Sequence, residues 1–203
     1  MSCDSAYVAP RTNSSAELRE KGSRFLALLR PAPSEGAAQT VVRELKSSYR
    51  DATHVCWAYR VGAPALVLER CADEGEPSGT AGQPILQALR AREASDAVLA
   101  VVRWYGGTKL GKGGLVRAYG AAAREAVEVA SWTERYAKVA FEVEAEWSQS
   151  GEIQRLATLP DVEQKNADWG ERVRLVLEVR AGRETSLVER LQALPVRWKH
   201  LDE

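Results

Sequence analysis

In the first two thirds of the chain, continuous runs of hydrophobic residues alternate with segments in which hydrophobic residues recur at helical spacing. Apolar residues fill 97–104 almost without interruption, which predicts a strand covered on both faces. Ser34 precedes apolar residues that recur every three or four positions, so 35–49 is predicted to be an amphipathic helix with Ser34 as its N-cap. Residues 1–14 are polar and are expected to be irregular. The other elements predicted here are strands at 23–29, 53–61 and 65–68, a short helix at 84–92 and an alanine-rich helix that ends near 130.

The pattern changes near Trp132 and then follows a strand–helix–strand–strand–helix–strand order. Phe141 and Val143 alternate with Glu142 and Glu144, as expected for a strand with one buried face. The βαββαβ order is that of the ferredoxin-like split βαβ motif. The predicted elements are strands at 136–146, 162–166, 172–180 and 196–201, and helices at 148–158 and 183–194.

The chain has 203 residues, which suits two small domains. We therefore predict an α/β protein of the α+β type, with an N-terminal domain at 1–132 and a ferredoxin-like C-terminal domain at 133–203. Lys and Arg number 28, as do Asp and Glu, so a wholly basic nucleic-acid binder is excluded but a local basic patch is not. No apolar run approaches the ~20 residues of a membrane helix, and residues 1–12 lack a signal-peptide core. We expect a cytoplasmic protein without membrane contact.

Histidine and cysteine are scarce in the chain. There are two histidines, His54 and His200, and three cysteines, Cys3, Cys56 and Cys71, without metal-site or disulfide spacing. His54 and Cys56 lie two positions apart on a predicted strand, which leaves a zinc site short of ligands. A buried cysteine beside a hydrogen-bonded histidine is the favoured interpretation over a catalytic thiol. We assign no catalytic residue, no metal ligand and no cofactor.

A glycine-rich loop follows the apolar strand in the segment RWYGGTKLGKGGLVRAYG, residues 103–120. No acidic residue occurs between Asp96 and Glu125. Glycines ahead of a helix N-terminus, with cations beside them, favour a phosphate group, although the same glycines would also serve a tightly packed turn. The candidate residues for binding nucleic acid or phosphate are Arg103, Trp104, Tyr105, Gly106, Gly107, Lys109, Gly111, Lys112, Gly113, Gly114 and Arg117.

An acidic loop, ADEGEPSGTAGQP at 72–84, precedes the short helix. Ser78 or Thr80 is a candidate N-cap, and Thr80 with Gln83 matches a capping box. The carboxylates either bind a divalent cation, pair across a surface groove with Arg103, Lys109 or Arg117, or belong to a solvated turn. The candidate residues of this loop are Asp73, Glu74, Glu76, Ser78 and Thr80.

Three segments together resemble the IMPACT/YigZ family: DATHVCWAY at 51–59, DEGEPSGTAGQPIL at 73–86 and VVRWYGGTKLGKGGLVRAYGAAA at 101–123. The resemblance implies an N-terminal domain like the second domain of a small-subunit ribosomal protein and domain IV of elongation factor G. It implies a C-terminal domain like the ferredoxin-like domains of that factor. Eukaryotic relatives regulate translation through the amino-acid-starvation kinase pathway, and they do so by binding proteins.

Three functions remain open at this point. The leading hypothesis is a non-enzymatic RNA- or ribosome-binding protein that modulates translation, because the glycine loop is basic and Trp104 and Tyr105 offer rings for base stacking. The second is an enzyme or sensor that binds a small phosphorylated ligand in the glycine loop. The third is a protein-interaction module with a protein partner.

Overall fold

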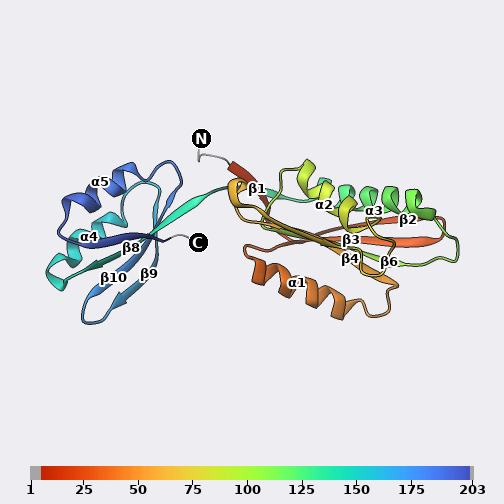
Figure 1. The fold of residues 1–203 in the computed structure, drawn as a ribbon, viewed down its shortest axis with the longest axis horizontal. Helices are drawn as coiled ribbons and strands as arrows, with labels where there is room; N and C mark the ends of the chain where they lie inside the picture. Colours follow the sequence, from red (N-terminus) through yellow and green to blue (C-terminus); the bar gives the residue numbers. More distant parts are fainter. Residues whose placement is uncertain (1–5, 202–203) are drawn as a thin grey trace. The chain divides into compact units, whose positions relative to one another are not determined.

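The computed structural model describes residues 6–201, which form two compact α+β units, Ala6–Arg135 and 136–201 (Figure 1). Cys3 lies outside the described residues. None of the helices in the described part of the chain has the length and apolar composition that crossing a membrane requires.

The N-terminal unit is built on a five-stranded sheet in which all neighbouring strands run antiparallel. The strand at Ala97–Trp104 is central and buried on both faces, as its continuous apolar run predicts. In spatial order, the strands are β2 (Ser14–Glu20), β3 (Ser23–Pro31), β6 (Ala97–Trp104), β4 (His54–Val61) and β5 (Leu68–Ala72).

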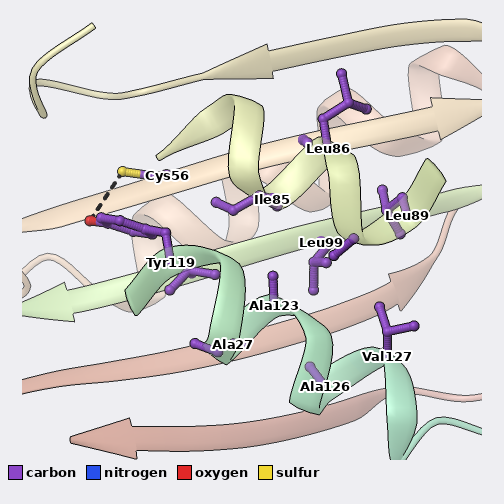
Figure 2. Close-up of a cluster of buried hydrophobic side chains, with 14 of the residues drawn as sticks. Ala27, Cys56, Ile85, Leu86, Leu89, Leu99, Tyr119, Ala123, Ala126 and Val127 are labelled. Atoms are coloured by element: carbon purple, nitrogen blue, oxygen red, sulfur yellow. Dashed lines mark hydrogen bonds between the residues drawn. The ribbon is translucent and has the colours of Figure 1, made fainter. Parts of the chain in front are cut away.

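Helices cover both faces of this sheet (Figure 1). On one face lies α1 (Glu35–Ser48), and its predicted N-cap is confirmed, because Ser34 Oγ accepts a hydrogen bond of 3.2 Å from the Ala37 N–H. On the other face lie α2 (Gly82–Ala91) and α3 (Gly111–Glu128). Figure 2 shows the core of this second layer, where side chains from both helices pack over the strands. A single helical turn, η1 (Pro64–Leu66), connects β4 to β5.

A second, two-stranded sheet pairs β1 (Ala6–Pro10) with β7 (Trp132–Tyr136). The expectation of irregular structure over 1–14 is therefore wrong for this part, and residues 1–5 lie outside the described residues. The strand escapes sequence-based prediction because it is only five residues long, AYVAP, and its pairing joins segments more than 120 residues apart.

Asp96 holds β1 and β7 against the sheet. Its buried carboxylate accepts hydrogen bonds from the Tyr7 hydroxyl (2.9 Å) and the Gly62 N–H (3.1 Å), and it pairs with Arg135 (2.7 Å). Burial, together with the neighbouring Asp96 carboxylate, raises the pKa of Tyr7 to about 12, so this hydroxyl stays a donor at neutral pH. One acceptor therefore fixes three segments that are distant in sequence.

The C-terminal unit has a four-stranded antiparallel sheet in the order β11-β8-β10-β9, with both helices packed on one face. This is the predicted ferredoxin-like arrangement. Val143 and Leu175 form its core with side chains from the helices. The elements are β8 (Lys138–Ala145), η2 (Trp147–Gln149), α4 (Ser150–Leu156), β9 (Val162–Trp169), β10 (Val173–Arg180), α5 (Thr185–Ala193) and β11 (Arg197–Leu201).

The role of Asp96 is tested by Asp96→Gly, because Asp96 has a left-handed φ of 52° that glycine adopts without strain. The change removes the acceptor of three donors, each hydrogen bond contributing about 0.5–1.5 kcal/mol, so β1 and β7 should detach together. Trypsin should then cut after Arg135 about tenfold faster or more than in the wild type, as measured by limited proteolysis with mass spectrometry. Glu44→Ala, at an exposed position of α1, is the control and should leave the rate unchanged. Equal rates for both variants would contradict the role given to Asp96.

Candidate functional site

A buried ion pair joins the acidic loop to the end of β6. Arg103 Nη1 lies 2.5 Å from Glu76 Oε1, and the side chains are only 7% and 3% exposed. The hydroxyl of Tyr119, on α3, donates a second hydrogen bond of 2.8 Å to the same oxygen. The predicted proximity of the acidic loop to Arg103 is confirmed for Glu76. The pair is buried, however, rather than lying across a surface groove.

Ser23 connects this ion pair to the glycine loop. Its hydroxyl oxygen accepts hydrogen bonds from Arg103 Nη2 (3.4 Å) and from the Gly106 N–H (3.2 Å). No local pattern in the sequence indicates Ser23 or Tyr119, because both join the network through contacts more than 40 residues apart in the chain. The acidic loop, the glycine loop, α3 and the start of β3 are thus held by one set of polar contacts.

Cys56 and His54 also face this network from β4. Cys56 Sγ lies 3.0 Å from the Asp73 carbonyl oxygen and 3.4 Å from the Tyr119 hydroxyl (Figure 2). Burial raises the pKa of Cys56 to about 12, so the thiol is protonated at neutral pH and is a poor nucleophile. His54 Nδ1 lies 2.9 Å from the Glu74 carbonyl oxygen. The favoured interpretation, a buried cysteine beside a hydrogen-bonded histidine, is confirmed.

Asp73 caps α2, and the N-cap predicted at Ser78 or Thr80 is wrong. The Asp73 carboxylate accepts hydrogen bonds from the N–H groups of Gly79 (2.8 Å), Ala81 (2.9 Å) and Gly82 (2.8 Å). Burial alone would raise the pKa of Asp73, but these N–H groups outweigh it and hold that pKa below its usual range. The Thr80 hydroxyl instead donates to the Pro77 carbonyl, and Ser78 is exposed. A local capping motif cannot detect an acceptor on a loop that folds back over the helix start.

The partners of Glu74 differ from those of Asp73 and Glu76. Its carboxylate pairs with Lys46 of α1 (2.7 Å) and accepts a hydrogen bond from Trp57 Nε1 (2.7 Å). Glu74 and Glu76 therefore pair with Lys46 and Arg103, and not with Lys109 or Arg117, the other predicted partners. Within residues 6–201, no cluster of three or more acidic, histidine or cysteine side chains is arranged to hold a metal ion.

The glycine loop depends on backbone conformations that only glycine adopts easily. Gly107 and Gly111 have φ values of +88° and +68°, in the left-handed region. Gly106 packs directly on the turn between β2 and β3, where a Cβ added to it would lie 1.9 Å from the Gly22 carbonyl carbon. The close backbone approach is thus made to another part of the same chain, while Gly107 and Gly111 face open space.

Cations beside this loop are exposed and unpaired. Lys109, Lys112, Arg117 and Arg124 have no carboxylate within 4 Å among the residues that the structure describes. Lys109 precedes α3, and Lys112, Arg117 and Arg124 lie on it. The helix starts after Leu110, whose side chain cannot cap it, so the first N–H groups of α3 lack a side-chain acceptor. The positive end of the helix dipole adds to the side-chain charges. This is an arrangement that favours an anion.

The two aromatic residues before the loop differ in accessibility. The Trp104 ring is covered by the Arg24 guanidinium at 4.5 Å, and its Nε1 donates to Asp51 (2.8 Å). Tyr105 is 45% exposed, and its hydroxyl donates a hydrogen bond of 2.6 Å to the Gly107 carbonyl. Of the two predicted stacking residues, Tyr105 offers the accessible ring.

These features define an α+β protein whose N-terminal unit carries a basic glycine loop anchored by a buried ion pair. The sequence profile described as the Impact N-terminal domain matches residues 21–127, which include both loops. The chain belongs to the IMPACT family.

Relatives match over most of both chains. An IMPACT family member of Haemophilus influenzae is 32% identical over 174 residues, 85% of this chain and 84% of the relative. A family member of Thermus thermophilus is 39% identical over 170 residues, 80% of this chain and 87% of the relative. A crystal structure of a hypothetical protein, 27% identical, superposes with a TM-score of 0.78 over 98% of each chain.

The contribution of the Glu76–Arg103 ion pair to the free energy of unfolding can be measured by urea denaturation. Glu76→Gln leaves the buried Arg103 charge without a counter-ion, so we expect a decrease of about 3–5 kcal/mol in the unfolding free energy in urea. Combined with Arg103→Met, the decrease should be smaller than the sum of the two single effects, because neither charge is then stranded. Glu74→Gln, which removes a partly exposed pair with Lys46, is the control and should cost about 0–1 kcal/mol. A Glu76→Gln effect no larger than that of the control would contradict this role.

Proposed function

We propose that this protein is a non-enzymatic RNA- or ribosome-binding protein that modulates translation, and that it holds RNA phosphates at the glycine loop and the start of α3. The observation that carries the proposal is the group of exposed cations without carboxylate partners beside an uncapped helix N-terminus. Such cations keep their full capacity to replace the counterions of a nucleic acid.

The spacing of the cations supports a polyanion rather than a single phosphate. Lys112 and Arg124 are twelve positions apart on α3, about 18 Å along the helix axis at 1.5 Å per residue. Arg117 and Arg124 are seven positions apart, which places them on the same side of the helix. Lys112 lies about 120–140° around the helix from these two residues. Arg117 and Arg124, about 10 Å apart along the axis, are therefore the pair that can meet phosphates of one strand from the same side of α3.

The alternative of an enzyme or sensor for a small phosphorylated ligand gains less support. It needs Asp73, Glu74 and Glu76 to act together on a metal ion or a proton, and the structure gives each carboxylate its own partners. The proposed role in translation comes from the resemblance to a family whose eukaryotic members regulate translation.

RNA binding is tested by fluorescence anisotropy at several salt concentrations. We expect wild-type affinity for a labelled RNA to fall steeply with salt. Lys112→Ala combined with Arg117→Ala should weaken binding at low salt and reduce the logarithmic salt slope by about 1.4, because each phosphate that a cation neutralises contributes about 0.7.

Arg43→Ala combined with Arg92→Ala is the matched control, since it removes one exposed cation from α1 and one that follows α2, close to the start of β6 and away from the glycine loop. This control should leave the slope unchanged. Co-sedimentation with ribosomes before and after nuclease treatment separates RNA contact from protein contact. Absence of RNA binding at low salt, or equal slopes for both double variants, would overturn the proposed function.

A further inference from the structure

A cation from a distant hairpin joins the same surface. Lys21 and Gly22 form the turn between β2 and β3, with left-handed φ values of 47° and 81°. A Cβ added to Gly22 would lie 2.9 Å from the Gly106 carbonyl oxygen, so this turn rests on the glycine loop. Lys21 is exposed and has no carboxylate within 4 Å among the described residues. The hairpin therefore adds an exposed positive charge next to the glycine loop.

Tyr105 directly precedes Gly106, the glycine on which this turn rests, and Lys109 follows it four positions later. Its backbone N–H donates to Thr53 Oγ1 (2.9 Å) and its hydroxyl to the Gly107 carbonyl (2.6 Å), so both the backbone and the far end of the ring are anchored although the residue is 45% exposed. The Arg103 guanidinium lies 5.5 Å from the ring centroid. A ring that is fixed before binding loses little conformational entropy when a ligand stacks on it.

A fixed, exposed aromatic ring close to cations distinguishes single-stranded from double-stranded RNA. Bases in a duplex are stacked on one another, so a duplex presents phosphates and sugar hydroxyls to the protein but no free base face. A base in a single strand can stack on an aromatic side chain while the adjoining phosphates meet the cations.

We propose that this surface binds single-stranded RNA, with one base stacked on Tyr105 and the adjoining phosphates held by Lys21 and Lys109. This inference rests on the proposed function and names its substrate class. It also assigns Lys21, a residue of the β2–β3 turn, to the binding surface.

The test uses fluorescence anisotropy on the full chain with two probes: a 12-nucleotide RNA without self-complementarity and the same sequence annealed to its complement. The wild type should bind the single strand at least about tenfold more tightly than the duplex. Tyr105→Ala should weaken single-strand binding by about 5- to 100-fold and leave duplex binding and the salt slope unchanged. Tyr105→Phe keeps the ring and removes only the hydroxyl, so it should bind within about threefold of the wild type.

Lys21→Asn removes the charge and keeps a residue that tolerates the left-handed conformation. It should lower the salt slope for the single strand by about 0.7, the value for one phosphate. Arg43→Ala, at an exposed position of α1, is its control and should leave the slope unchanged.

The outcomes distinguish the single-strand inference from the proposed function. Equal or tighter binding of the duplex, or a Tyr105→Ala variant that binds the single strand like the wild type, would overturn the single-strand inference and leave RNA binding intact. A salt slope for Lys21→Asn equal to that for Arg43→Ala would overturn the assignment of Lys21. Failure of both probes to bind at low salt would overturn the proposed function itself.

Discussion

The buried pair of Glu76 and Arg103 is the contact on which the shape of the N-terminal unit's loops depends. Two charges taken out of water are tolerated only when each compensates the other and further donors complete the site. Here Tyr119 supplies a donor from α3, and Ser23 links Arg103 to the glycine loop. The strand end, the acidic loop and the glycine loop are therefore held in fixed relative positions, which is what a preformed binding surface requires.

The same arrangement separates paired acidic side chains from unpaired cations. Each carboxylate of the acidic loop has partners: Asp73 accepts hydrogen bonds from backbone N–H groups, Glu74 contacts Lys46 and Trp57, and Glu76 pairs with Arg103. None of them is left to neutralise the cations beside α3. Because Lys109, Lys112 and Arg117 stay unpaired and exposed, the surface keeps a local positive charge in a protein whose formal net charge is zero.

The sequence predicts the parts of this structure whose cause is local. A continuous apolar run identifies β6, and alternation with helical spacing identifies the ferredoxin-like order of the C-terminal unit. Three features cannot be found this way. The pairing of β1 with β7, the capping of α2 by Asp73 and the approach of Lys21 to the glycine loop all join segments that only the folded chain brings together. For the same reason the sequence suggests Trp104 as a stacking residue, since the residue that covers its ring, Arg24, is eighty positions away.

One surface of the N-terminal unit is proposed to bind RNA. The most direct measurement is a titration of the uniformly ¹⁵N-labelled protein with single-stranded RNA, followed through the backbone amide resonances. We expect the largest shifts on Lys21, Gly22, Gly106, Gly107 and the first turn of α3, with 136–201 little affected. Shifts confined to 136–201, or spread over the α1 side of the sheet, would contradict the claim.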